Sequence, residues 1–189
     1  MIKINRFLYI ISFLLIALII GCAPRTWVRL DQIYMNGPDN TYSVNLPFGW
    51  VHAEFVKDKL LITRDGPGIQ IILIEKYSHQ NAFPAIGKRS SEDMLPSELA
   101  ELTISEMKAT SDMSNIVVLE NKPTTIGGRP GFRIHAQFKN ERGLRYELIL
   151  YGFTNKIGFY TLYYRAPSLH YFPRDIEVFE NIVKSFTLN

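Results

Sequence analysis

Apolar and polar residues alternate along much of this chain, which predicts β-strands with one buried side and one solvent-facing side. The stretches Tyr42–Leu46 and Phe132–Lys139 alternate in this way. The stretch Ile69–Lys76 differs, because its run Ile71–Ile74 is apolar at every position. A strand of that composition is typical of the middle of a sheet that is covered on both faces.

Turn residues between the predicted strands indicate β-hairpins. Asp65-Gly66 separates the predicted strands Lys59–Arg64 and Ile69–Lys76, and an Asp-Gly step is a strong hairpin signal. Asn140-Glu141-Arg142-Gly143 predicts a type I turn that ends in a left-handed glycine, and Thr154–Ile157 predicts a second tight hairpin. The turn at 140–143 predicts one shared buried face for Ile134, Ala136, Phe138, Tyr146, Leu148 and Leu150.

Helical spacing of apolar residues occurs twice, in Pro96–Thr110 and in Arg174–Ser185. A short strand, Ile116–Leu119, follows the first of these helices. The order of strands, helix, antiparallel strands and helix predicts an α+β fold in which helices cover an antiparallel β-sheet. The connection Tyr77–Leu95 is long for a compact domain, which is typical of a functional loop, a mobile loop or an unrecognised element.

The first twenty-two residues have a different character. Lys3 and Arg6 precede the uncharged apolar run Phe7–Ile20, and Gly21 stands before Cys22, the only cysteine of the chain. As a helix this run would cover about 20 Å, less than the roughly 30 Å of a hydrocarbon core. A positive start, a short apolar run and a small residue are the pattern of a signal peptide.

Ile19-Ile20-Gly21-Cys22 resembles the lipobox of bacterial lipoproteins, although the consensus prefers leucine where Ile19 stands. The resemblance implies cleavage between Gly21 and Cys22, followed by acylation of Cys22. Two or more acyl chains hold a protein firmly on a membrane. Ala23 after the cysteine favours a location at the outer membrane, with the domain facing the periplasm. In a bacterium without an outer membrane, the expected location is the outer face of the cell membrane. An uncleaved N-terminal anchor is the alternative, and it too places the domain outside the cytoplasm.

The expected division of the chain is a signal peptide at 1–21, the lipidated Cys22 and a tether at 22–40, and one domain at 41–189. The tether contains Trp27, Leu30, Ile33 and Tyr34, which are too apolar for a free linker. Part of it is therefore expected to pack on the domain.

Three stretches of the domain resemble the PsbP-like superfamily, which includes an extrinsic photosystem subunit, a Ran-release factor and many bacterial lipoproteins. They are Tyr42–Trp50, the turn Ile126–Phe132 and the closing Phe179–Phe186, and the resemblance covers Thr41–Asn189. It implies an α/β/α sandwich that docks onto other proteins or membrane complexes and has no enzymatic activity.

The sequence contains no recognised catalytic motif, so we expect no enzyme, no cofactor and no metal site. Its four histidines, His52, His79, His135 and His170, never stand four residues apart. Without Lys3 and Arg6 the basic residues fall from 21 to 19 against 18 acidic residues, which leaves a net charge of +1. Such a small charge argues against a nucleic-acid partner.

Two surfaces are candidates for binding. A basic cluster on paired strands is a candidate docking surface for an acidic partner or a lipid head group, or else a solvated sheet surface satisfied by Glu147 and aromatic rings. Its members are Arg129, Arg133, His135, Lys139, Arg142 and Arg145. An aromatic cleft is the candidate site of a periplasmic small-molecule binder, and it is predicted to contain Trp50, Tyr77, His79 and Phe83. The predicted function is that of a membrane-anchored lipoprotein with a docking domain, and small-molecule binding is the alternative.

Overall fold

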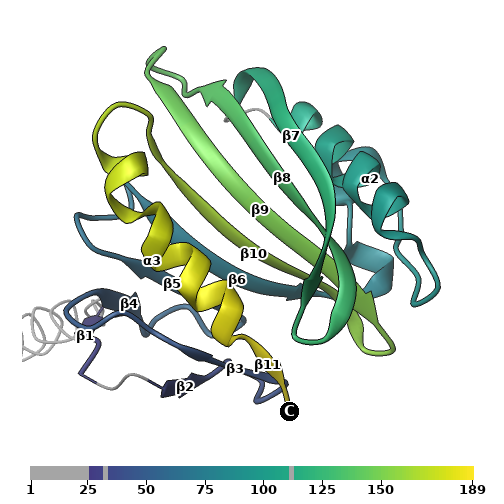
Figure 1. Cartoon of the computed structure of the whole chain (residues 1–189), viewed down its shortest axis with the longest axis horizontal. Coiled ribbons are helices and arrows are strands. Elements are labelled where there is room, and N and C mark those ends of the chain that lie inside the picture. Colours follow the sequence, from purple (N-terminus) through teal and green to yellow (C-terminus); the bar gives the residue numbers. More distant parts are fainter. Residues whose placement is uncertain (1–25, 32–33, 111–112) are drawn as a thin grey trace, which may run out of the picture.

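The structure is a computed structural model that describes residues 26–31, 34–110 and 113–189. The predicted signal peptide, Gly21, Cys22 and Ile33 lie outside the described residues. Within them, eight strands form one antiparallel sheet and three more form a small second sheet (Figure 1). The large sheet contains, in spatial order, β1 (Trp27–Arg29), β4 (Val51–Ala53), β5 (Lys59–Thr63), β6 (Ile71–Tyr77), β10 (Gly158–Pro167), β9 (Arg145–Asn155), β8 (Arg129–Lys139) and β7 (Ser114–Ile126).

The small sheet brings the C-terminal strand beside the second and third described strands. It consists of β11 (Thr187–Leu188), β3 (Tyr42–Asn45) and β2 (Tyr34–Asn36). Ser43 Oγ lies 2.7 Å from Thr187 Oγ1 across the β3–β11 pair. None of the helices in the described part of the chain is both long enough and apolar enough to cross a membrane.

Each of the two α-helices in the described part of the chain covers part of one face of the large sheet, as Figure 1 shows. Helix α3 (Tyr171–Ser185) packs on one face, where Phe179 and Ile182 join a core with Ile72 and Tyr160. Helix α2 (Pro96–Ala109) packs on the other face, over β7, β8 and β9. The core on this face includes Leu99 and Ala100 of α2 together with Ile134, Leu148 and Phe159 of the sheet. The predicted α+β fold with an antiparallel sheet between helices is confirmed.

The predicted register of the β8–β9 hairpin is also confirmed. Ile134 pairs with Leu150, Ala136 with Leu148, and Phe138 with Tyr146, all on the α2 face. The turn between the strands ends at Gly143, whose φ of 74° is left-handed, and the Gly143 amide donates to the Asn140 carbonyl at 2.8 Å. Glycine suits this position because it has no Cβ to clash in that conformation.

Three elements differ from the prediction. Strand β7 extends over 114–126, well beyond the predicted 116–119, and it tolerates Pro123 because β8 is its only partner among the described strands. Helix α3 begins at Tyr171, three residues before the predicted start at Arg174. Within the predicted tether, Trp27 lies in β1 and Leu30 is buried, so the folded part begins before Thr41.

Candidate functional site

The six residues of the predicted basic cluster do not form one patch. Arg129 begins β8 and Lys139 ends it. At about 3.3 Å per residue, these two positions lie roughly 33 Å apart. The predicted cluster is therefore corrected to three separate groups: Arg129 at one end of the strand, Arg133 with His135 in its middle, and the remaining three cations at the β8–β9 turn.

The middle group is neutralised by acidic side chains. Arg133 Nη2 donates to Glu180 Oε1 of α3 at 3.0 Å, and Arg133 Nη1 forms an ion pair with Glu120 of β7. His135 Nε2 lies 2.8 Å from Glu147 Oε2, and its ring stacks on Phe172. These contacts fasten β7, β8 and α3 to one another, so the middle group serves packing rather than docking.

The end group has a different environment. Lys139, Arg142 and Arg145, here called the hairpin-tip cations, are all exposed, and none of them forms an ion pair with another described residue. Lys139 and Arg145 stand directly opposite each other as the last pair of β8 and β9. Like charges in that position are destabilising for a sheet. The tip therefore gathers three positive charges around one exposed acid, Glu141.

A cavity of about 510 Å³ lies on the α2 face of the sheet. It exists because α2 covers β7, β8 and β9 but leaves β5, β6 and β10 open on that side. Its walls are mostly apolar and come from the sheet, from α2 and from the Tyr77–Leu95 connection. Lining residues include Leu73, Tyr77, Phe83, Met107, Phe159 and Tyr163.

One polar row crosses the floor of this cavity. Lys59, Glu75 and Thr161 are neighbours across β5, β6 and β10. Lys59 Nζ donates to Glu75 Oε1 at 2.6 Å, and the Tyr77 hydroxyl donates to Glu75 Oε2 at 2.6 Å. The hydrogen bond to Glu75 raises the pKa of Lys59, and burial raises the pKa of Tyr77. The floor thus combines apolar contact surface with polar groups that satisfy each other, which suits binding of a mainly apolar molecule.

Two of the four predicted cleft residues line this cavity and two do not. Tyr77 and Phe83 are in its wall, whereas Trp50 is buried in the core on the α3 face. His79 lies 2.8 Å from Ser90 Oγ and 3.0 Å from the Asn155 carbonyl oxygen, so it fastens the loop to the β9–β10 hairpin. The prediction of a single cleft containing all four residues is wrong, because strands β3 and β4 carry Trp50 to the opposite face.

The loop itself is ordered around two short 3-10 turns, η1 (His79–Asn81) and η2 (Pro84–Ile86). Glu106 of α2 accepts hydrogen bonds from the amides of Ala85 and Ile86 at 2.8 and 3.1 Å. This helix therefore holds η2, and with it Phe83, at the rim of the cavity.

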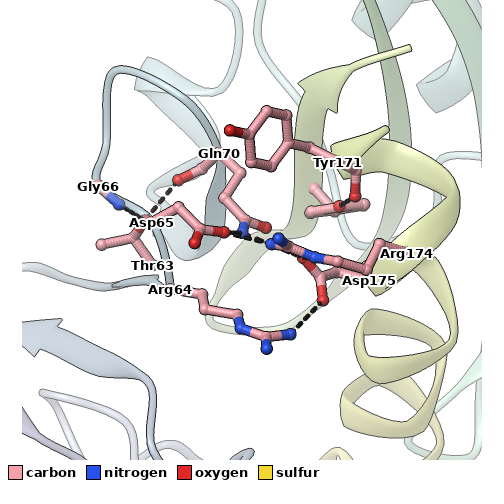
Figure 2. A network of polar contacts seen from close by, with 9 residues as sticks. Thr63, Arg64, Asp65, Gly66, Gln70, Tyr171, Arg174 and Asp175 are labelled. Atoms are coloured by element: carbon pink, nitrogen blue, oxygen red, sulfur yellow. Dashed lines mark hydrogen bonds and ion pairs between the residues drawn. The ribbon is translucent and has the colours of Figure 1, made fainter. Parts of the chain in front are cut away.

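A polar network around the buried Asp175 links the β5–β6 turn to α3, and no sequence pattern indicated it (Figure 2). Asp175 is 1% exposed and accepts hydrogen bonds from Arg64 Nη1 at 3.1 Å, Gln70 Nε2 at 3.0 Å and Arg174 Nε at 2.9 Å. Gln70 and Arg174 also donate to Asp65. We call these five residues the Asp175 network. Its members lie up to 111 positions apart, so only the folded chain brings them together.

Solved structures with a similar fold include three proteins of distant sequence. The Saccharomyces cerevisiae Ran-binding protein Mog1p has a TM-score of 0.57 and 8% identity, covering 84% of this chain and 95% of that chain. The cyanobacterial PsbP protein CyanoP of Synechocystis sp. PCC 6803 has a TM-score of 0.55 and 7% identity, covering 89% and 96%. A Bacteroides thetaiotaomicron protein has a TM-score of 0.54 and 12% identity over 85% of this chain.

The chain spans about half the length of the Bacteroides protein, 49%. Neither a known family model nor a curated protein sequence matches the chain. At such low identities the likeness concerns the fold alone. The fold is that of PsbP and Mog1, as the sequence resemblance implied.

Proposed function

We propose that this protein is a lipid-anchored accessory protein of the bacterial cell envelope, whose domain docks onto another envelope protein and performs no chemistry of its own. The lipobox-like segment ending at Cys22 supports the anchoring, with the outer membrane as the favoured location. The fold supports the docking role, since Mog1p, which shares it, is a Ran-binding protein.

The observation that carries the docking role is the hairpin tip. Three exposed cations without acidic partners among the described residues stand where β8 and β9 meet in a tight turn. Two of them, Lys139 and Arg145, repel each other in the free protein. An acidic surface on a partner removes that repulsion and gains charge complementarity, which favours specific and rapid association.

Photo-crosslinking in intact cells tests this role. The full chain should trap one reproducible protein neighbour, and that product should disappear when Lys139, Arg142 and Arg145 are all changed to Glu. The matched control is Arg129→Glu, an exposed cation at the other end of β8, which should leave the product intact. No neighbour for the natural chain, or an undiminished product with the triple variant, would contradict the proposal. Thermal unfolding of each variant checks that the domain remains folded.

The cavity on the α2 face supports a second candidate function, the binding of a small, mainly apolar molecule. Its volume of about 510 Å³ lies within the usual range for ligand sites. The fluorescence of 1-anilinonaphthalene-8-sulfonate bound to the full chain measures this binding. The variant Leu73→Trp, which fills the cavity, should lower that fluorescence, and Leu119→Trp on exposed β7 should not. Equal fluorescence from both variants would exclude the cavity as the site.

A further inference from the structure

We propose that the β1–β4 edge of the large sheet is the surface that this protein lays on the bilayer. The inference rests on the proposed acylation of Cys22 and adds a defined orientation to it. Strand β1 is the last strand at its end of the sheet, and β4 is its partner among the described strands.

The first argument is the length of chain between the acylated residue and the fold. Trp27 begins β1 and follows Cys22 by only five residues. A fully extended chain covers at most about 3.6 Å per residue, so Trp27 lies within roughly 18 Å of the Cys22 backbone whatever the path between them. A tether this short keeps the β1–β4 edge near the bilayer.

The second argument is the chemistry of that edge. The rings of Trp27 and Phe55 meet edge to face, with centroids 5.5 Å apart, and Phe55 is 39% exposed. Phe48 is 68% exposed in the β3–β4 turn, which is joined to the far end of β1 by the hydrogen bond from the Gly49 amide to the Leu30 carbonyl. Aromatic side chains, tryptophan above all, favour the boundary between water and the acyl chains.

Charge contributes little to the contact. The exposed cations Arg29 and Lys57 are accompanied by the exposed acids Glu54 and Asp58. The edge therefore has no excess of either sign among these four residues. Attachment through aromatic rings should be insensitive to salt, whereas attachment of a basic patch to anionic lipids weakens as salt rises.

The orientation has a consequence for docking. Strands β1 and β7 stand at opposite ends of the eight-stranded sheet, as Figure 1 shows. Seven strand spacings of about 4.8 Å separate them by up to roughly 34 Å. With β1 on the bilayer, β7 and the neighbouring β8–β9 hairpin are held away from the lipid. The hairpin-tip cations then face a partner rather than the headgroups.

Tryptophan quenching on vesicles tests the orientation. The acylated full chain is placed in phosphatidylethanolamine and phosphatidylglycerol vesicles whose acyl chains are either ordinary or brominated, since bromine quenches nearby tryptophan. The natural chain carries Trp27 at the edge and the buried Trp50, and the variant Trp27→Phe carries only Trp50. A third chain combines Trp27→Phe with Val117→Trp, which places a tryptophan on exposed β7 at the other end of the sheet.

We expect brominated lipid to reduce the emission of the natural chain, at low and at high salt alike, and to leave the emission of both variants unchanged. Both substituted positions, Trp27 and Val117, avoid the buried core, so folding is retained. If mass spectrometry of the same sample shows an acylated Cys22, an unquenched natural chain or an equally quenched Val117→Trp chain would overturn the orientation. A sample without acyl groups would overturn the anchoring itself, and the orientation with it.

Discussion

Replacing Asp175 by alanine should destabilise the domain by disrupting the network in Figure 2. The carboxylate is 1% exposed and accepts hydrogen bonds from three side chains, two of them arginines. Alanine removes every one of these acceptor contacts. It leaves Arg64 without its carboxylate and the Gln70 amide with Asp65 alone.

The expected loss is about 2–3 kcal/mol of unfolding free energy. Removing one partner of a fully buried ion pair costs about 3–5 kcal/mol. The side chains of Arg64 and Arg174 are 49% and 27% exposed, so water solvates them once the carboxylate is gone and lowers the cost. The remaining loss is comparable to that of one buried hydrogen bond with a charged group, which contributes about 1.5–3 kcal/mol.

Equilibrium urea unfolding of the full chain measures this effect. The midpoint should fall while the m-value stays unchanged, because the surface exposed on unfolding is the same. The control is Glu177→Ala, an exposed acid on the same helix, which should stay within about 0.5 kcal/mol of the natural chain. If Asp175→Ala were as stable as this control, the network would contribute nothing to stability and the reasoning would be refuted.

Three further predictions concern acid stability, packing and the cavity. Burial alone would raise the pKa of Asp65, but hydrogen bonds within the Asp175 network lower it below the ordinary value of about 3.9. The unfolding free energy should therefore be steady above about pH 5 and fall as pH drops through the lowered pKa. The variant Asp65→Asn should flatten that fall. Gly158→Ala should cost about 1–3 kcal/mol in urea unfolding because its Cβ would collide with the Tyr77 carbonyl, whereas Gly68→Ala, with open space around it, should not. Phe83→Ala should cost about 3 kcal/mol, because the buried ring is 1% exposed, and should enlarge the cavity enough to increase 1-anilinonaphthalene-8-sulfonate fluorescence; unchanged fluorescence would contradict the assigned site.

Local patterns predicted the elements of this fold well. Alternation along Phe132–Lys139 and the turn ending at Gly143 were enough to place β8 against β9 in the correct register, because a strand's side chains change face at every residue. Pro96–Thr110 was recognised as a helix from apolar spacing alone. Strand β7 was underestimated, because polar residues and Pro123 follow its apolar stretch Ile116–Leu119.

The sites depend on contacts between distant parts of the chain, which local patterns do not contain. Arg133 looked like part of a basic surface because its acidic partners, Glu120 and Glu180, stand 13 and 47 residues away. Trp50 and Phe83 looked like members of one cleft because nothing in either stretch tells which face of the sheet it covers. Lys139 and Arg145 do stand directly opposite each other, because one tight turn joins their strands.

The anchoring of this domain at Cys22 is tested most directly by mass spectrometry of the N-terminal peptide from the protein isolated from its native membrane. The account predicts that this peptide begins at Cys22 and carries a diacylglyceryl group on the sulfur together with an acyl chain on the nitrogen. A peptide that begins at Met1, or an unmodified Cys22, would contradict it.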